Sequence, residues 1–389
     1  MAGVTESIPE KDTTARYRSA LLDWPGAAPA TDPTALEGHG SVAWHYGDPL
    51  GEQHKTTVFI DRSHLATVAI TGADAATLCN SLLSQKLDDA APGTLTEALN
   101  LDAQGRVLHH AHVVVGDNLI LLTAEDTHAH QLSDYITKMV FWNDAEVRIH
   151  PLGIMTLLGD PDADIVAETR HLATLARDCG ATTHPATITP DDLDSMGGIL
   201  RPIPEGPRAR VDVLLPREHT DAFARALSDR GAHPAGLLTF TAHRVFAMDA
   251  QTGIDSDERT IPHENPQWVR NAVHLNKGCY RGQETVARVD NIGQSPRALV
   301  RVLLDGSCPQ LPAPGAPITS GGRPVGFLGT IAQHHEWGPV GLAMIKRSAL
   351  GSAALQCEQA ALTIDRDSLP EDSGPKAGKL AQQRLKGQL

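Results

Sequence analysis

Residues 277–284 are the segment whose residue types and spacing point most directly to chemistry, and they read Lys-Gly-Cys-Tyr-Arg-Gly-Gln-Glu. Cys279 stands between two glycines, with Lys277 two residues before it and Arg281 two residues after it. Glycine lets the backbone bend sharply and lets another group approach closely. Neighbouring cations favour the thiolate, the form of cysteine that attacks electrophiles and binds metals. The alternative is a tight turn whose cysteine is a small buried apolar residue. The pattern predicts a reactive Cys279, with Lys277 as the partner that favours its thiolate.

This octet is similar to the Lys-Gly-Cys-Tyr-x-Gly-Gln-Glu signature of the YgfZ family of folate-binding proteins. The mitochondrial iron–sulfur assembly factors of the same superfamily share the signature. The family in turn resembles the T-protein of the glycine cleavage system, a tetrahydrofolate-dependent aminomethyltransferase. Asp61-Arg-Ser63 and Gly72-Ala-Asp-Ala75 also resemble a family pattern, and the resemblance covers most of residues 57–346.

The resemblance implies further residues that would contact folate. Residues 242–255 are similar to the end of a family helix, although Met248 replaces the first glycine of that pattern. Arg244 in this segment offers a planar fork of donors for the pterin ring or the glutamate tail, with a surface salt bridge as the alternative. Glu264 ends a segment similar to the family's Leu-Pro-x-Glu, where it would accept from a pterin amino group or cap the next turn. Glu205 is a further acidic candidate for a pterin contact.

Inside the octet, three residues are expected to shape the loop beside the folate. We expect Gln283 and Glu284 to hydrogen-bond the loop backbone and Tyr280 to hold the loop in place. The set that the resemblance assigns to cofactor binding is therefore Arg244, Glu264, Glu205, Tyr280, Gln283 and Glu284.

One departure from the T-protein concerns the strand that follows the turn at residues 100–106. There the T-protein carries an aspartate near the reactive nitrogen of folate, in a Gly-Gly-x-x-Asp-Asp pattern, whereas this chain reads Gly105-Arg-Val-Leu-His109-His110. A mostly neutral imidazole is a poor substitute for a carboxylate that steadies a developing cation. His110 and His112 share one face of a strand and His109 points to the other. A metal would need a third ligand from elsewhere, so we predict no metal site.

Composition excludes several classes of protein. The chain has 389 residues and a formal net charge of -14, which argues against sequence-independent binding of nucleic acid. Its five cysteines form no C-x-x-C pair, which favours a reducing compartment. A cluster held by one chain usually needs four ligands, so we expect at most shared or transient cluster binding. No signal-peptide pattern and no apolar run of about 18 residues is present, so we expect a cytoplasmic protein.

The elements that position these residues indicate an α+β fold, because strands with adjacent hairpins mix with helices. We expect strands at 95–101 and 107–115, helices at 127–139 and 235–248, and a strand at 285–289 after the octet. From residue 296, short strands separated by turn formers favour a small barrel. The resemblance implies a three-domain, T-protein-like cloverleaf with two interleaved α+β domains and a C-terminal β-barrel. The expected parts are an N-terminal arm (1–37), a first folate-binding domain (38–145), a second domain carrying the octet (146–295), the barrel (296–366) and a tail (367–389).

Three functions compete. The first, implied by the resemblance, is a tetrahydrofolate-binding accessory protein that supports the assembly or repair of iron–sulfur clusters, including those of tRNA-modifying enzymes. Its partners would be iron–sulfur enzymes or cluster-assembly proteins, with no direct contact to nucleic acid or membrane. The second is a folate-dependent aminomethyltransferase or other one-carbon transferase, which His109 and His110 argue against. The third is a scaffold with an inert Cys279 and no folate.

Overall fold

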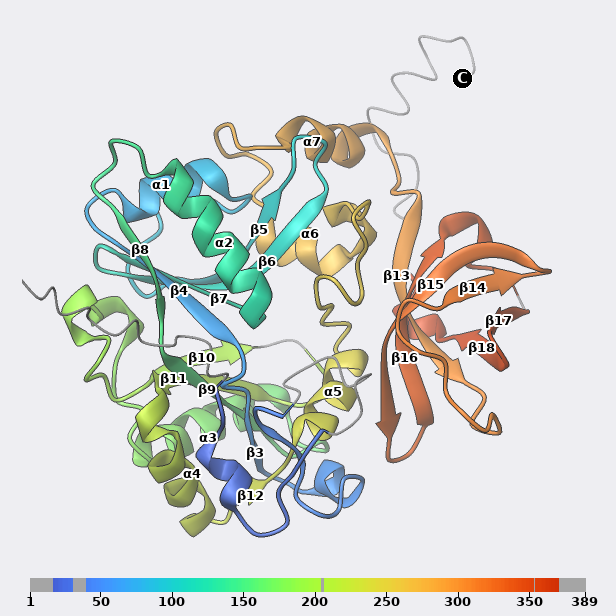
Figure 1. Ribbon diagram of the computed structural model, residues 1–389, viewed down its shortest axis with the longest axis horizontal. Helices are drawn as coiled ribbons and strands as arrows, with labels where there is room; N and C mark the ends of the chain where they lie inside the picture. The colour runs from blue at the N-terminus through green and yellow to red at the C-terminus, as the bar shows by residue number, and fades with distance from the viewer. Residues whose placement is uncertain (1–16, 31–39, 204–205, 353, 371–389) are drawn as a thin grey trace, which may run out of the picture.

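Two five-stranded sheets and a closed barrel make up the part of the chain that the computed structural model describes, residues 17–30, 40–203, 206–352 and 354–370 (Figure 1). The first sheet is antiparallel, with strand order β5-β6-β7-β4-β8. Its strands are β4 (Ala66–Thr71), β5 (Leu95–Leu101), β6 (Val107–Gly116), β7 (Leu119–Ala124) and β8 (Glu146–His150). Helices α1 (Ala75–Leu82) and α2 (Asp126–Met139) pack on one face of this sheet.

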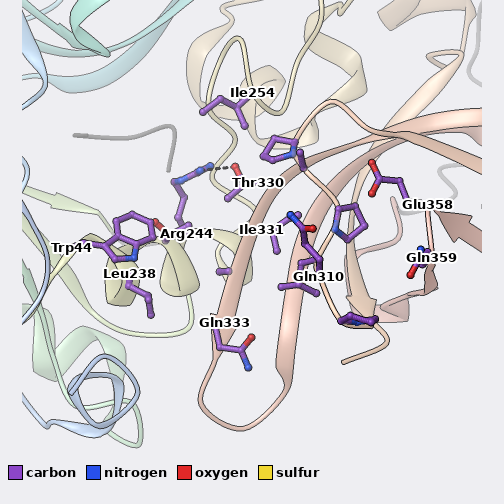
Figure 2. A pocket seen from close by; sticks show the side chains of 17 residues that line it. Trp44, Leu238, Arg244, Ile254, Gln310, Thr330, Ile331, Gln333, Glu358 and Gln359 are labelled. Carbon is purple, nitrogen blue, oxygen red and sulfur yellow. Dashed lines mark hydrogen bonds between the residues drawn. The ribbon is translucent and has the colours of Figure 1, made fainter. Parts of the chain in front are cut away.

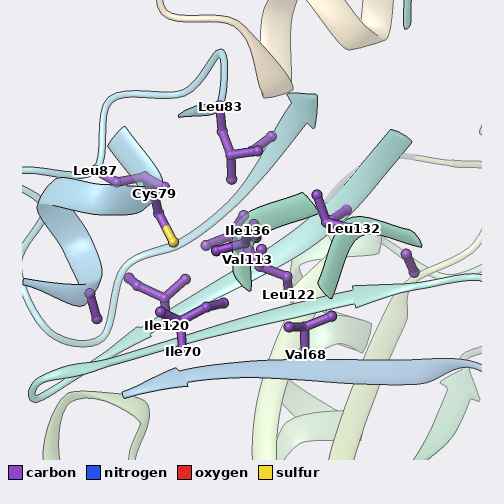
Figure 3. Close-up of a cluster of buried hydrophobic side chains, with 14 of the residues drawn as sticks. Val68, Ile70, Cys79, Leu83, Leu87, Val113, Ile120, Leu122, Leu132 and Ile136 are labelled. Atoms are coloured by element: carbon purple, nitrogen blue, oxygen red, sulfur yellow. The ribbon is translucent and has the colours of Figure 1, made fainter. Parts of the chain in front are cut away.

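The core between this sheet and its helices contains one of the cysteines. Figure 3 shows the Cys79 sulfur among Ile70, Ile120 and neighbouring aliphatic side chains. Burial raises the pKa of the Cys79 thiol to about 12. This thiol is therefore a packing residue of the kind that a buried cysteine normally is.

The second sheet has strand order β10-β11-β9-β3-β12 and is covered on both faces. Its strands are β3 (Val58–Asp61), β9 (Leu152–Leu158), β10 (Ile199–Ile203), β11 (Arg210–Pro216) and β12 (His233–Pro234). Side chains alternate across a strand: Phe59 packs with α3 (Ile165–Asp178) and α4 (Thr220–Asp229), whereas Val58 and Ile60 pack under α5 (Leu237–Phe246). Leu21, from the segment expected to be an arm, is buried in the same core as Phe59.

The two sheets exchange segments of the chain. The strand β3 lies in the second sheet, the next five strands, β4 to β8, make up the first sheet, and β9 to β12 then complete the second. A short pair, β1 (Ala28–Pro29) with β2 (Ala43–His45), lies apart from both sheets. The interleaving agrees with the expected arrangement.

The C-terminal barrel closes in the order β13-β16-β15-β14-β17-β18, with β18 pairing back onto β13. Its strands are β13 (Arg297–Leu304), β14 (Pro317–Ser320), β15 (Arg323–His334), β16 (Gly338–Lys346), β17 (Leu355–Cys357) and β18 (Ala360–Ile364). Helices α6 (Pro266–Ala272) and α7 (Gln283–Ile292) lie between the sheets and the barrel in the sequence. The predicted α+β class with a small C-terminal barrel is confirmed.

One predicted element is wrong: residues 285–289 belong to helix α7 and not to a strand. The β-branched residues Thr285, Val286 and Val289 suggested a strand, but only Val286 among them is fully buried. Within the described residues, no helix is both long and apolar enough to cross a bilayer.

Candidate functional site

The octet forms a loop that exposes its cysteine and buries the residues on either side. Gly278 and Cys279 are exposed, whereas Lys277 and Tyr280 are buried. Tyr280 packs in a core with Trp268 and Val286, and burial raises the pKa of its hydroxyl to about 12. The thiol therefore stands on a short exposed segment between two buried anchors.

Lys277 anchors the loop to the first sheet's helix α1. Its ammonium donates to the backbone carbonyls of Leu83 and Gln85, at 2.7 and 2.8 Å, and to that of Asn80. The carbonyls of Asn80 and Leu83 lie at the C-terminal end of α1, where the helix dipole favours a cation. Burial lowers the pKa of Lys277 to about 8, although three carbonyl acceptors stabilise its charged form. All three N–H donors of the Lys277 ammonium are engaged by these carbonyls. The expectation that Lys277 favours the thiolate of Cys279 stays a prediction.

Close backbone contact fixes the other end of the octet. Gly282 caps α7 with a φ of 82°, and a Cβ there would lie 2.6 Å from the Asp102 carbonyl oxygen and 2.7 Å from the Gly105 Cα. Gly105 likewise has a φ of 77°, and its Cβ would meet Thr285 at 2.7 Å. Only glycine fits such positions without strain. The octet is thus packed directly on the turn between β5 and β6.

The two remaining octet residues differ in what they contact. The Gln283 side-chain amide donates to the Lys277 carbonyl at 3.1 Å, as expected of a residue that shapes the loop. Glu284 is exposed in the first turn of α7, and no hydrogen bond joins it to the described loop backbone. A carboxylate in that turn stabilises the helix through its dipole.

Arg244 is buried and ties the chain after α5 to the barrel. Its guanidinium donates to the Thr330 hydroxyl at 2.6 Å (Figure 2). It also donates to the Asp249 carbonyl and to Asp255, both at 2.8 Å. Asp255 also accepts from the Thr330 backbone N–H at 2.7 Å. The surface salt bridge considered from the sequence is therefore a buried one, and the guanidinium fork holds β15 of the barrel against the body.

Glu264 is 1% exposed and pairs with the first residue of β13. Arg297 donates to both of its carboxylate oxygens at 2.8 Å, and Glu264 also accepts from the Ile261 backbone N–H at 3.2 Å. This is the capping role weighed from the sequence, with an ion pair added. Glu205 lies outside the described residues.

The histidines of β6 occupy two faces, as the strand pattern predicts. His110 lies 2.8 Å from Glu97, and although burial opposes its charged form, Glu97 outweighs that effect and raises the pKa of His110. His112 lies 3.9 Å from the same carboxylate, and burial lowers its pKa to about 3. On the other face, His109 contacts Asn100 at 3.1 Å, and burial lowers its pKa to about 4.

A cavity of about 970 Å³ lies between α5 and the barrel (Figure 2). Its lining is mixed and includes Trp44, Leu238, Arg244, Gln310, Gln333 and Gln359. Arg244 also borders a second cavity of about 40 Å³, which His110 and His112 line as well. Cys279 lines neither of them. The expected position of the octet loop beside the folate stays a prediction.

A buried charge cluster near the second cavity was not predicted. Asp212 accepts from Arg201 at 2.7 Å and from Arg210 at 2.9 Å, and Arg210 also reaches Asp249 at 3.0 Å. Burial would raise the pKa of Asp212, but the surrounding arginines hold it well below its usual range. The register of β10 and β11 pairs Arg201 with Asp212 and so places opposite charges side by side on two apolar strands. Charged residues within otherwise apolar strands are the sequence feature from which this cluster could have been predicted.

Comparison with known proteins shows which families the chain is similar to. The CAF17 C-terminal β-barrel domain matches residues 297–370. The tRNA-modifying protein YgfZ of Yersinia enterocolitica is 23% identical over 256 residues, 64% of this chain and 71% of that protein. The chain resembles the YgfZ/CAF17 family.

A further relative and one solved structure agree with the fold. A chloroplastic protein of Arabidopsis thaliana that carries a transferase name is 26% identical over 75% of this chain, which spans 66% of that protein's length. The crystal structure of the glycine cleavage system aminomethyltransferase T from Bartonella henselae superposes with a TM-score of 0.69 at 17% identity, over 88% of this chain and 94% of that one. This likeness confirms the T-protein-like architecture predicted from the sequence.

Proposed function

We propose that this protein binds tetrahydrofolate or a derivative and supports the assembly or repair of iron–sulfur clusters, including clusters of tRNA-modifying enzymes. The observation that carries the proposal is the exposed Cys279 between the buried Lys277 and Tyr280. A loop anchored on both sides of one exposed thiol presents that thiol at a defined place. The name of the Yersinia relatives, tRNA-modifying protein, supports the same assignment.

The cavity between α5 and the barrel is our candidate for the folate. Its volume of about 970 Å³ lies in the range of small-molecule sites, which are mostly apolar with a few polar groups that fix orientation. Trp44 offers an aromatic face, and three glutamine amides offer donors and acceptors for a pterin or a glutamate tail. Arg244 already donates to several acceptors, so it would contribute positive charge to the site. Bound folate would supply a one-carbon carrier.

We assign Cys279 to contact with a partner protein, because it lies apart from that cavity. Four ligands usually hold a cluster, so one thiolate from this chain would be a transient ligand beside the partner's own. All five cysteines are unpaired, which supports a reducing compartment such as the cytoplasm. The net charge of -14 supports protein partners over direct contact with nucleic acid.

The test is to express variants in a strain that lacks the gene and to measure iron–sulfur enzyme activity under oxidant stress. Cys279→Ala is expected to fail and the control Cys308→Ala to restore activity. Full rescue by Cys279→Ala would refute the role of this thiol.

A parallel measurement titrates tetrahydrofolate by calorimetry. Trp44→Ala is expected to weaken binding and Cys279→Ala to leave it unchanged. An equal loss in both variants would contradict the separation of the two sites. The second candidate, aminomethyl transfer, is favoured by the T-protein-like fold alone, and formation of methylenetetrahydrofolate from an aminomethyl donor at an enzymatic rate would establish it.

A further inference from the structure

The hairpin between β15 and β16 carries three adjacent residues with metal-binding side chains. His334 ends β15, His335 and Glu336 form the turn, and Gly338 opens β16 with a φ of 68°. One ligand atom from each of His334, His335 and Glu336 lies within 4.8 Å of the others. The hairpin tip therefore gathers two imidazoles and a carboxylate on a short stretch of chain.

A buried glutamine orients the His335 ring. The Gln53 side-chain amide donates to the Gln333 carbonyl at 2.9 Å, which leaves its oxygen as the acceptor facing His335. The backbone N–H of His335 and its ring Nδ1 both lie 3.1 Å from that oxygen. Nδ1 therefore carries the proton, and Nε2 keeps its lone pair. A hydrogen bond that fixes the tautomer in this way is the usual support of a histidine that binds a metal.

The His334 ring also has an unprotonated nitrogen. Its Nδ1 accepts from the backbone N–H groups of Glu336 at 3.1 Å and Trp337 at 3.3 Å. Both of these residues are exposed, so water can replace the ring nitrogen as their acceptor if a metal takes it. The His334 and His335 rings stack with centroids 4.3 Å apart, and Glu336 lies 3.8 Å from the His335 Nε2.

A third imidazole comes from a distant part of the chain. His54, which ends the 3-10 helix η2 (Gly51–His54), places its ring 4.0 Å from that of His335. The cluster thus joins the barrel hairpin to the segment that precedes β3. It also lies beside Gln333, which lines the large cavity, but it shares no residue with the octet.

We propose that His334, His335 and Glu336, with His54 as the fourth ligand, bind one divalent transition-metal ion of the zinc class. Imidazole and carboxylate ligands suit Zn²⁺ and its late first-row neighbours. In a tetrahedral site with bonds of about 2.0 Å, ligand atoms lie roughly 3.3 Å apart. Small rotations of side chains at an exposed hairpin tip suffice to close the present spacing. The ion would link the barrel to the body, independently of the proposed function.

The experiment titrates ZnCl₂ into the full-length, untagged protein in the Cys279→Ser background, so that the exposed thiol does not compete. One bound ion is expected in calorimetry, and Co²⁺ is expected to give an absorption spectrum without thiolate charge transfer. His335→Ala should abolish this binding. Gln53→Leu should weaken it by about 10- to 100-fold, the usual loss for a group that supports a metal ligand.

Two further variants keep the result interpretable. His334→Asn preserves an acceptor for the turn's N–H groups while removing the imidazole, so it should lose binding with an unchanged circular dichroism spectrum. His233→Ala removes an exposed histidine of β12 and should bind as the parent does. Failure of the parent to bind in excess ZnCl₂, or unchanged affinity in His335→Ala, would overturn the proposal.

Discussion

Replacing Gly282 by alanine should disrupt the packing of the octet on the β5–β6 turn, whereas the same change at Gly278 should not. Both are glycines of one signature, but their surroundings differ. Gly282 has a φ of 82° and would place its Cβ 2.6 Å from the Asp102 carbonyl oxygen, whereas a Cβ at Gly278 meets nothing within 4 Å. Alanine at 278 therefore serves as a matched control.

The expected magnitude follows from two separate effects. A left-handed conformation costs an L-residue with a side chain roughly 1–2 kcal/mol. Overpacking against groups that cannot move aside costs a further ~1–3 kcal/mol, and the groups here are backbone atoms of the β5–β6 turn. Gly282→Ala should thus lower the free energy of unfolding by about 2–5 kcal/mol. Gly278→Ala should change it by less than about 1 kcal/mol.

The assay is urea denaturation followed by circular dichroism, with hydrogen exchange of residues 277–292 as the local readout. Gly282→Ala should show faster exchange in this segment as well as lower stability. Because Gly105 makes the reciprocal contact, the double variant with Gly105→Ala should lose less than the sum of the two single losses. Equal and small effects of alanine at 282 and 278 would refute the close-contact reasoning.

Two further predictions concern buried ionisable groups. Burial lowers the pKa of His64 to about 3, below its unfolded value of about 6.5. Between these two pH values only the unfolded chain binds a proton at His64, so the free energy of unfolding falls as the pH drops from about 6.5 to about 3. His64→Leu should flatten the dependence of unfolding free energy on pH between these values by up to about 1.4 kcal/mol per pH unit; an unchanged slope in urea titrations would contradict this. Arg297→Met removes the arginine that pairs with the buried carboxylate of Glu264 and should cost about 3–5 kcal/mol. The exposed Arg323→Met should cost less than about 0.5 kcal/mol, and similar midpoints of thermal unfolding for the two variants would disprove the difference.

Local patterns predicted much of the fold. The strand expected at residues 95–101 is β5 to the residue, because apolar alternation and a following turn are properties of a short segment. Residues 285–289 show where such patterns fail. Their β-branched composition favours a strand, but the left-handed Gly282 and the docking of Val286 into the core start a helix there. Tertiary contacts outweigh intrinsic propensity in such a case.

The site was predicted in part. The type of a residue indicates what chemistry its side chain can do, but it does not indicate which way that side chain points in the fold. Cys279 is exposed as expected. Lys277 is near it in sequence, but its ammonium points to carbonyls almost two hundred positions away, at the end of α1. Arg244 and Glu264 were expected either to contact a ligand or to have a structural role, and both hold parts of the protein together. Their contact with a ligand stays a prediction. The residues around His334 match no known metal-binding sequence motif. Only the fold of the β15–β16 hairpin and of η2 brings the imidazoles of His334, His335 and His54 together.

The core around Tyr280 has a consequence for how the chain matures. It takes side chains from β5, α5 and α6, and also from β13, β15 and β16 of the barrel. During translation the N-terminal parts leave the ribosome first, so the apolar face of α5 and α6 stays in water until Met344 has emerged from the exit tunnel. A nascent chain stalled before the barrel would expose that face together with the unpaired Glu264, and would be a ready target for chaperones or proteases.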